Sequence, residues 1–227
     1  MKNPTIISLG GSLIVPDEID VPFVSAFKQL IEKEVASDKS FILITGGGKI
    51  CRRYQKAGTE ISGLSNEELD WLGIHVTRLN AEFMRIVFGS AAHPNIIIDP
   101  TTGGSIKESL AIGAGWKPGW STDFVAVLMA KTLGAKRIVN LSNIDYAYDK
   151  DPNKYPDAKK IEKISWKEFR EIIPAEWSPG VNTPFDPIAA REAEELGIEV
   201  AIMNGKNLAN LESYLNGRVF QGTVISG

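Results

Sequence analysis

The sequence predicts an α/β fold in which helices cover both faces of a mainly parallel sheet. Strand-like apolar segments alternate with amphipathic helical segments from one end of the chain to the other. The strand-like segments are almost continuously apolar, as expected for parallel strands that are buried on both faces. No Ser- or Pro-rich linker and no internal repeat divides the sequence. We therefore expect one domain over residues 1–227.

Proline, glycine and capping residues indicate where the elements begin and end. Asp20 caps a helix with Pro22 near its first turn, while Gly134 and Gly197 come just after the ends of two others. The expected strands are residues 5–9, 40–45, 96–99, 137–141, 199–203 and 223–225. Further helices are expected at residues 65–88, 122–133, 165–173, 187–196 and 207–215.

The long helix at residues 65–88 carries more apolar residues than one face needs. Ser65 and Glu68 form a capping-box pattern at its start. One stripe at spacings of three and four residues comprises Leu69, Leu72, Val76, Leu79, Phe83 and Ile86. Trp71, Ile74 and Met84 fall outside this stripe and indicate a second apolar face, which a lone subunit would expose. We therefore expect a homo-oligomer, with a dimer through this helix.

Charge and hydropathy exclude several classes of partner. The chain has 25 basic and 28 acidic residues, a net charge of −3. Proteins that bind nucleic acid through its backbone usually carry a basic excess, so we expect no nucleic-acid partner. The longest apolar stretch, residues 124–130, is far shorter than the roughly 20 residues of a membrane span. We expect a small anionic ligand and no membrane partner.

The cysteine and histidine content predicts a cytoplasmic protein without a metal site of its own. Cys51 is the only cysteine and cannot form an internal disulfide, which suits a reducing compartment. The first residues do not have the pattern of a signal peptide, because Gly10 and Gly11 interrupt the apolar run. His75 and His93 have no second ligand at metal-binding spacing.

Two expected strands lead directly into glycine-rich loops. Residues 5–9 are followed by Gly10-Gly11-Ser12, and residues 40–45 by Gly46-Gly47-Gly48-Lys49. Such loops form ordinary tight turns, but their backbone N–H groups can also converge on an anion. The second loop opens a helix whose first turns contain Lys49, Arg52 and Arg53, which favours phosphate binding. The fingerprints of P-loop NTPases and Rossmann dehydrogenases are both absent.

Two later loops follow the same strand-to-helix logic. Residues 114–123, AGWKPGWSTD, end in a helix cap at Ser121 or Thr122 and also offer backbone amides and two indole rings. Residues 141–160 are dense in Asn, Asp, Pro and Tyr, a composition that is typical of a surface turn. Because active sites of such sheets lie at the carboxyl ends of the strands, both loops are candidates for ligand contact.

Taken in order, these segments resemble the amino-acid kinase superfamily, and within it the uridylate kinases of the archaeal type. The resemblance is carried by SLGGSLIVP (8–16), GGGKICRRY (46–54), DWLGIHVTRLNA (70–81), PGWSTDFVAV (118–127), SNIDYAYDKDP (142–152) and FDPIAA (185–190). It implies a three-layer αβα sandwich, an acceptor lobe at about residues 1–135 and an ATP lobe at about 136–227. It also implies phosphoryl transfer from ATP, with Mg²⁺, to UMP, and assembly as hexamers built from dimers.

The resemblance assigns roles residue by residue. Gly10, Gly11 and Ser12 match the loop around the transferred phosphoryl group, and Asp123 matches an aspartate that orients catalytic groups. The residues that match the ATP side are Gly48, Arg52, Ser142, Tyr148 and Asp151. The residues that match the UMP side are Gly47, Asp70, Gly115, Trp116, Lys117, Pro118, Gly119, Trp120, Ser121 and Thr122.

Two positions depart from the superfamily pattern. Many members have a lysine at the position of Ser8, where it neutralises charge on the transferred phosphoryl group. Lys49 is the best replacement, with Lys117 and Lys150 as weaker alternatives. Tyr146 stands where relatives usually have a glycine, so the adenine-side loop is expected to differ in shape.

We therefore expect transfer of the γ-phosphoryl group of ATP to a phosphate oxygen of UMP. That oxygen is already anionic at neutral pH, so no general base is needed, and positioning and charge stabilisation supply the catalysis. Two alternatives stay open. One is a superfamily kinase with another small acceptor, such as a carbamate, acetylglutamate or isopentenyl phosphate. The other is a nucleotide- or oxyanion-binding storage or regulatory protein that has lost transfer.

Overall fold

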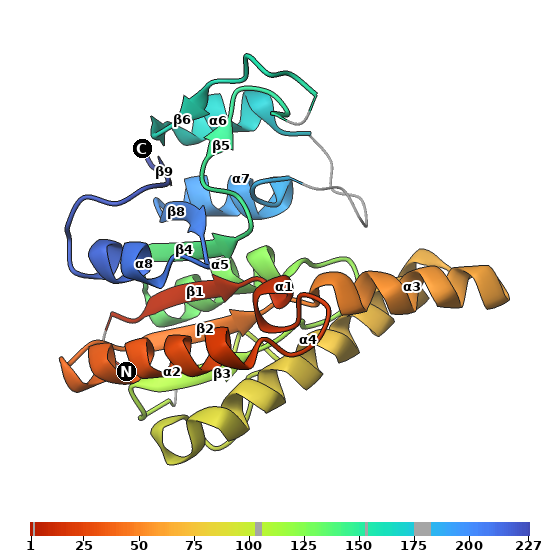
Figure 1. Ribbon diagram of the computed structural model, residues 1–227, viewed down its shortest axis with the longest axis horizontal. Coiled ribbons are helices and arrows are strands. Elements are labelled where there is room, and N and C mark those ends of the chain that lie inside the picture. Colours follow the sequence, from red (N-terminus) through yellow and green to blue (C-terminus); the bar gives the residue numbers. More distant parts are fainter. Residues whose placement is uncertain (2, 103–105, 153, 175–182) are drawn as a thin grey trace.

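A seven-stranded sheet runs through the centre of the molecule, seen in a computed structural model that describes residues 1, 3–102, 106–152, 154–174 and 183–227 (Figure 1). Its strands, in spatial order, are β3 (Leu110–Gly113), β2 (Phe41–Thr45), β1 (Thr5–Leu9), β4 (Arg137–Ser142), β8 (Glu199–Asn204), β9 (Thr223–Ile225) and β7 (Lys163–Ile164). The first five are mutually parallel, whereas β9 runs antiparallel to β8. The expected mainly parallel sheet is confirmed.

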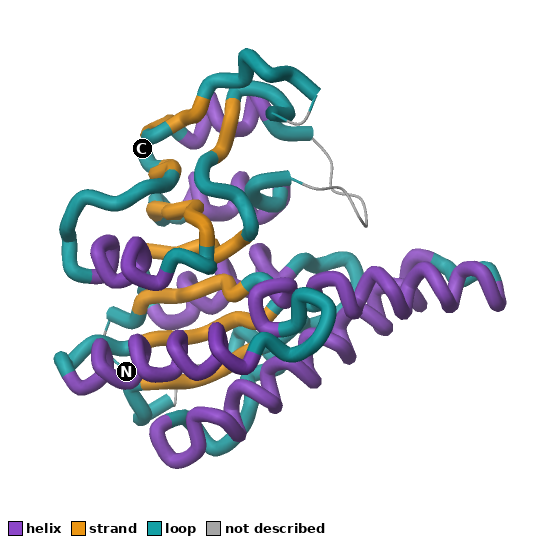
Figure 2. The backbone as a smooth tube through the Cα atoms, viewed as in Figure 1, coloured by secondary structure: helices purple, strands orange, loops and turns teal. Residues whose placement is uncertain are grey.

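Helices cover both faces of this sheet and make three layers (Figure 2). One face carries α1 (Gly11–Ile14), α2 (Val21–Ala36), α4 (Asn66–Phe88) and α8 (Leu208–Leu215). The other carries α5 (Thr122–Leu133), α6 (Trp166–Ile172) and α7 (Pro187–Glu195). The helix α3 (Gly48–Ser62) packs beside α4 and extends away from the end of the sheet (Figure 1).

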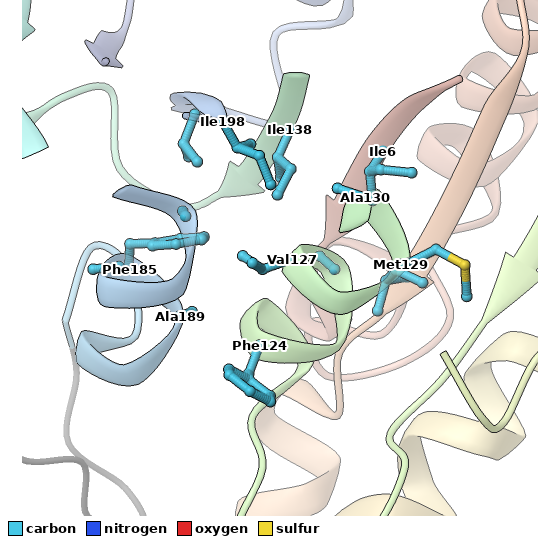
Figure 3. Packing of buried hydrophobic residues seen from close by; sticks show 14 of the residues in the cluster. Ile6, Phe124, Val127, Met129, Ala130, Ile138, Phe185, Ala189 and Ile198 are labelled. Atoms are coloured by element: carbon cyan, nitrogen blue, oxygen red, sulfur yellow. The ribbon is translucent and has the colours of Figure 1, made fainter. Parts of the chain in front are cut away.

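Alternate residues of each strand enter two separate cores. Ile6 of β1 packs in the core under α5 and α7, whereas its neighbour Ile7 packs in the core under α2 and α4. Figure 3 shows the first of these cores, where Val127 of α5 and Ala189 of α7 lie with Ile138 of β4. Both faces of every central strand are therefore buried, which explains their almost continuous apolar sequences.

Most expected elements are confirmed to within one residue, and one strand was predicted wrongly. Residues 96–99 form no strand; Ile97 makes only an isolated bridge to Gly113. The edge strand is instead β3, at Leu110–Gly113. Asp99 accepts hydrogen bonds from the backbone N–H and hydroxyl of Thr101, so this segment turns just where a strand would need to continue. The short strands β5 (Ala147–Tyr148), β6 (Lys160–Ile161) and β7 were not anticipated.

The capping box of α4 is confirmed, and the assignment of its two faces is only partly right: Val76 is buried and Trp71 exposed as expected, but four other residues are not placed as expected. The Ser65 hydroxyl accepts from the N–H of Glu68, and the Glu68 carboxylate accepts from the N–H of Ser65. Ile74 and Met84, expected on the outer face, are buried in the core. Leu79 and Ile86, expected in the inner stripe, are 67% and 62% exposed.

The buried face of α4 also contains polar residues, which an apolar pattern cannot reveal. Thr77 and Asn80 are both buried on this face, where they hold loops at the end of the sheet. Their presence rotates the true inner face away from the stripe of large apolar side chains. The outer face of the helix consequently exposes Trp71, Leu79 and Ile86.

Candidate active site

The two glycine-rich loops touch each other at the carboxyl ends of β1 and β2. These strands pair in parallel, from Thr5 with Phe41 to Leu9 with Thr45, so both loops emerge side by side. A Cβ atom on Gly11 would collide with the backbone oxygen of Gly46 and lie 2.6 Å from the nitrogen of Gly48. Gly48 itself has a φ of +63°, in the left-handed region. Only glycine allows the two loops to approach this closely.

Side chains from the neighbouring elements hold the second glycine loop in place. The amide of Asn80 on α4 donates to the backbone oxygen of Gly46, at 2.8 Å. The hydroxyl of Thr45, at the end of β2, donates to the backbone oxygen of Thr77, also on α4, at 2.9 Å. This loop is thus fixed to α4 before it opens α3, and the free N–H groups at the start of α3 can receive an anion.

A cavity of about 400 Å³ begins at these loops and runs along the ends of β1 and β4. Gly10, Thr122, Asp123, Ser142, Tyr148 and Asp151 are the predicted site residues that line it. Ser8 and Asp123 contribute polar groups to the lining beside the glycine loops. At the end of α6, Ile172, Ile173 and Pro174 contribute apolar surface. This combination of a polar loop region and an apolar wall suits a nucleotide.

The predicted acceptor loop, residues 115–122, is attached to α4 by three side chains. The carboxylate of Asp70 accepts from the N–H of Gly119 at 2.7 Å. Thr77 Oγ1 accepts from the N–H of Gly115 at 2.8 Å, and Arg78 donates to the backbone oxygens of Gly115 and Trp116. The loop therefore has a defined path beside the second glycine loop, which α4 also holds.

The two indole rings of the acceptor loop are already engaged within the protein. The Trp120 ring stacks on Phe124 at the start of α5, with centroids 4.1 Å apart and planes 19° apart. The Nζ atom of Lys117 lies 3.9 Å from the centroid of the Trp116 ring. Ser121 caps α5 by accepting from the N–H of Phe124, as the sequence predicts.

Asp123 is the carboxylate that faces the glycine loops, and its environment disfavours its charge. The Ser8 hydroxyl donates to Asp123 Oδ1 at 3.1 Å, and the N–H of Asp186 donates to Oδ2 at 3.3 Å. Burial, and next the nearby Asp186 carboxyl, raise the pKa of Asp123 to about 7. Burial likewise raises the pKa of Asp186, which caps α7. Two acids thus meet where many superfamily members have a lysine.

The predicted basic residues are not gathered in this cavity. Lys49 Nζ lies 3.3 Å from Asp17 Oδ2, and Arg53 binds the same carboxylate at 2.8 Å. Arg52 is exposed on α3, and Lys117 covers Trp116. Within the described part of the chain, Lys150 is the one basic side chain that lines the cavity, and it pairs with Asp157 at 2.7 Å.

Several lining residues were not anticipated from the sequence. Asn140 of β4 lines the cavity and donates to the backbone oxygen of Pro184, at 3.1 Å. Asp186, two residues after Pro184, does not line the cavity but donates its N–H to the carboxylate of Asp123, which does. The Asp-Pro pair that opens α7 signals a helix start, but no sequence pattern says that this start meets α5. Tyr146 also lines the cavity without a predicted binding role, and Lys150, a weaker candidate for the missing lysine, lines it too.

Cys51 and the two histidines lie outside the cavity lining. Cys51 packs against Gly47, where an added Cβ would lie 2.7 Å from Cys51 Cβ, and burial raises the pKa of its thiol. His93 Nδ1 lies 2.7 Å from a Glu108 carboxylate oxygen, and His75 packs near Trp71. The described residues contain no group of three His, Cys, Asp or Glu side chains placed to bind a metal ion, and none of their helices is long and apolar enough to cross a membrane.

The pKa of Asp123 predicts a pH-dependent stability. A carboxyl whose folded-state pKa is about 7, against an ordinary 3.8, destabilises the fold as the pH rises between these values. Asp123→Asn keeps an acceptor for Ser8 and removes the charge. We expect it to raise the free energy of unfolding on the order of 2 kcal/mol at pH 8 and much less at pH 5. Urea unfolding at both pH values measures this, and an equal change at both would contradict it.

Comparison with known proteins places this geometry in a family. The model of the amino acid kinase family matches residues 3–204. The curated uridylate kinases of Thermococcus kodakarensis and Methanospirillum hungatei are 32% and 34% identical; the matches cover 97% and 98% of this chain and 98% and 95% of theirs. The crystal structure of uridylate kinase from Archaeoglobus fulgidus, 31% identical, superposes with a TM-score of 0.83 over 100% of both chains. The chain therefore belongs to the amino acid kinase family, in which its curated relatives are uridylate kinases.

Proposed function

We propose that this chain is a uridylate kinase, which transfers the γ-phosphoryl group of ATP to UMP and yields ADP and UDP. The observation that carries the proposal is the joint attachment to α4 of the second glycine loop and the acceptor loop, through Asn80 and Asp70 respectively. Two substrates that meet in line need their binding loops at a fixed separation, which one rigid helix provides. The names of the curated relatives support UMP as acceptor.

In this proposal the cavity holds ATP and the acceptor loop holds UMP. Ser142, Tyr148 and Asp151 surround the adenosine, while Gly48 and Arg52 contact the ATP phosphates. Gly47 binds the UMP phosphate, and the Asp70 carboxylate accepts hydrogen bonds from the ribose. The loop at residues 115–122 surrounds the nucleotide. Gly10, Gly11 and Ser12 surround the transferred group. Gly11 and Ser12 donate their N–H groups to it, because the N–H of Gly10 is bonded to the backbone oxygen of Leu141. The lobes at 1–135 and 136–227 contribute acceptor and donor sites.

Mg²⁺ fits this site as a companion of ATP. It prefers oxygen ligands and keeps several waters, commonly binding through one or two carboxylates and substrate phosphates. Asp123 is the carboxylate available to it or to its water shell, since it lines the cavity with Gly10 and Gly46. When bound, the ion neutralises charge on the phosphate oxygens. The chain's own contribution is to position both nucleotides and to exclude water.

The acceptor is tested by ADP release over a panel of nucleotides and other small phosphate acceptors. We expect UMP to be used best, and dUMP roughly 5- to 150-fold less well, since dUMP lacks the 2′-hydroxyl that would donate to Asp70 and offset its desolvation. Asp70→Asn should narrow this ratio. ADP release with a carbamate or isopentenyl phosphate but not with UMP would contradict the proposal, as would tight ATP binding without transfer to any acceptor.

Lys49 is proposed to supply the positive charge that the position of Ser8 lacks. It follows Gly48 in the first turn of α3 and would have to exchange its Asp17 partner for phosphate. Lys49→Ala should lower kcat roughly 10²-fold or more, the scale for losing one preorganised charge. Arg53→Ala is the matched control, because Arg53 binds the same Asp17 but lies one turn further along the helix. Equal turnover of the two variants would assign Lys49 to the surface.

The exposed side of α4 is proposed to form a dimer, from which hexamers are built. Trp71, Leu79 and Ile86 form an apolar row along this helix, and Trp71 and Leu79 directly follow Asp70 and Arg78, which hold the acceptor loop. Burying such a row is favourable, and a shared helix face suits a two-fold contact.

The free thiol of Cys51 and the nucleotide substrates support a cytoplasmic location.

Light scattering after size exclusion tests this assembly. The wild-type protein should have a mass at least twice the chain mass of 24.8 kDa. Leu79→Glu should lower the measured mass and leave the far-ultraviolet circular dichroism spectrum unchanged. Ile61→Glu on α3 is the control, since Ile61 is 82% exposed but lies on another helix. A monomeric wild type at micromolar concentration, or an equal effect of both changes, would contradict the α4 interface.

A further inference from the structure

Alternate residues from Ile144 to Lys150 line the cavity. Ile144, Tyr146, Tyr148 and Lys150 all line it, whereas the residues between them do not. This alternation is that of an extended segment, in which successive side chains point to opposite sides. Tyr146 therefore stands in a row with Tyr148, toward the same space, although the resemblance to the family gives it no role.

The backbone on either side of Tyr146 is fixed by side chains from other strands. Asn204, at the end of β8, donates to the carboxylate of Asp145 at 2.9 Å. The N–H of Ala147 donates to the hydroxyl of Thr223 on β9, at 2.8 Å, and both residues are fully buried. The chain is thus restrained on both sides of Tyr146 before any ligand binds, which lowers the entropic penalty of a contact with this residue.

A cation covers part of the ring from outside the cavity. Lys160 Nζ lies 4.8 Å from the centroid of the Tyr146 ring, and it also pairs with Glu162 at 2.8 Å. Lys160 is not part of the cavity lining, whereas Tyr146 is. The Lys160 contact therefore restrains the ring and leaves aromatic surface open toward the cavity.

The composition of the cavity determines which part of a nucleotide would meet this ring. Phosphates belong with the glycine loops, at the end of the cavity that Gly10 and Gly46 line, because the N–H groups at the start of α3 follow there. The residues contributed by the β4–β5 segment and by the end of α6, such as Ile144 and Ile173, are mostly apolar or aromatic. A flat purine base, unlike a phosphate, is stabilised by such surroundings.

We propose that Tyr146 stacks against the purine base of the donor nucleotide and so sets the affinity of this site for ATP. The proposal rests on the proposed function only in taking the cavity as the donor site. Base-on-aromatic stacking is tolerant of the base but requires a ring. Tyr146 therefore acts as a binding residue for the donor and has no part in the transfer step.

The test uses calorimetry with the full chain, a non-hydrolysable β,γ-imido analogue of ATP, and tripolyphosphate as a baseless probe. Tyr146→Ala should weaken binding of the analogue roughly 10-fold and leave binding of tripolyphosphate within about twofold. Tyr146→Phe should bind the analogue like wild type, and Tyr146→Leu should resemble Tyr146→Ala, because leucine fills space without a ring. The KM for UMP should stay unchanged in all three.

Tyr155→Ala is the matched control, because Tyr155 also lies under a lysine, Lys150, but does not line the cavity. It should bind both probes like wild type. Unchanged analogue binding by Tyr146→Ala would overturn the stacking role, as would a loss in Tyr146→Phe as large as that in Tyr146→Ala. A wild type that binds the analogue but transfers nothing to UMP would overturn the proposed function alone, so the two failures are distinguishable.

Discussion

The contact between the two glycine loops is the constraint on which the rest of the site depends. Gly11 lies against the backbone of Gly46 and Gly48 so closely that a single methyl group would push the loops apart. This contact requires β1 and β2 to be adjacent, parallel and in register up to Leu9 and Thr45. Strand pairing deep in the core thereby fixes where the N–H groups of both loops point. Such preorganised donors stabilise charge without reorganisation during a reaction.

The helix α4 converts this local contact into a site for two ligands. Its inner side holds the second glycine loop through Asn80 and the acceptor loop through Asp70 and Thr77. Its outer side exposes the apolar row that includes Leu79. Along this helix, Asp70 and Arg78 hold the acceptor loop, and the residues that follow them, Trp71 and Leu79, are exposed. A partner that packed on the exposed row would therefore restrain the helix turns that hold the acceptor loop. Assembly and substrate positioning would share one helix.

The sequence predicts the framework well because the framework is built from local and repetitive signals. Apolar strands, caps such as Ser65 and stops such as Gly134 are each encoded within a few residues. The edge strand β3 was missed because its segment, LAIG, contains alanine and glycine, which are depleted in strands. Part of the face assignment of α4 was wrong because Thr77 and Asn80 are buried for their hydrogen bonds, which depend on loops distant in sequence.

The loops that meet at the carboxyl ends of the strands could be identified from the sequence, whereas the charge balance of the site could not. Ser8 and Asp123 are 115 positions apart, and nothing in either segment indicates that they share a hydrogen bond beside Asp186. Burial, and next the Asp186 carboxyl, raise the pKa of Asp123, and Ser8 on β1 supplies a hydroxyl there but no positive charge. A phosphate beside Asp123 would raise that pKa further, and an arriving cation would lower it. The charge that balances the donor phosphates must therefore enter with the ligands or from a mobile side chain such as that of Lys49, and not from the strand.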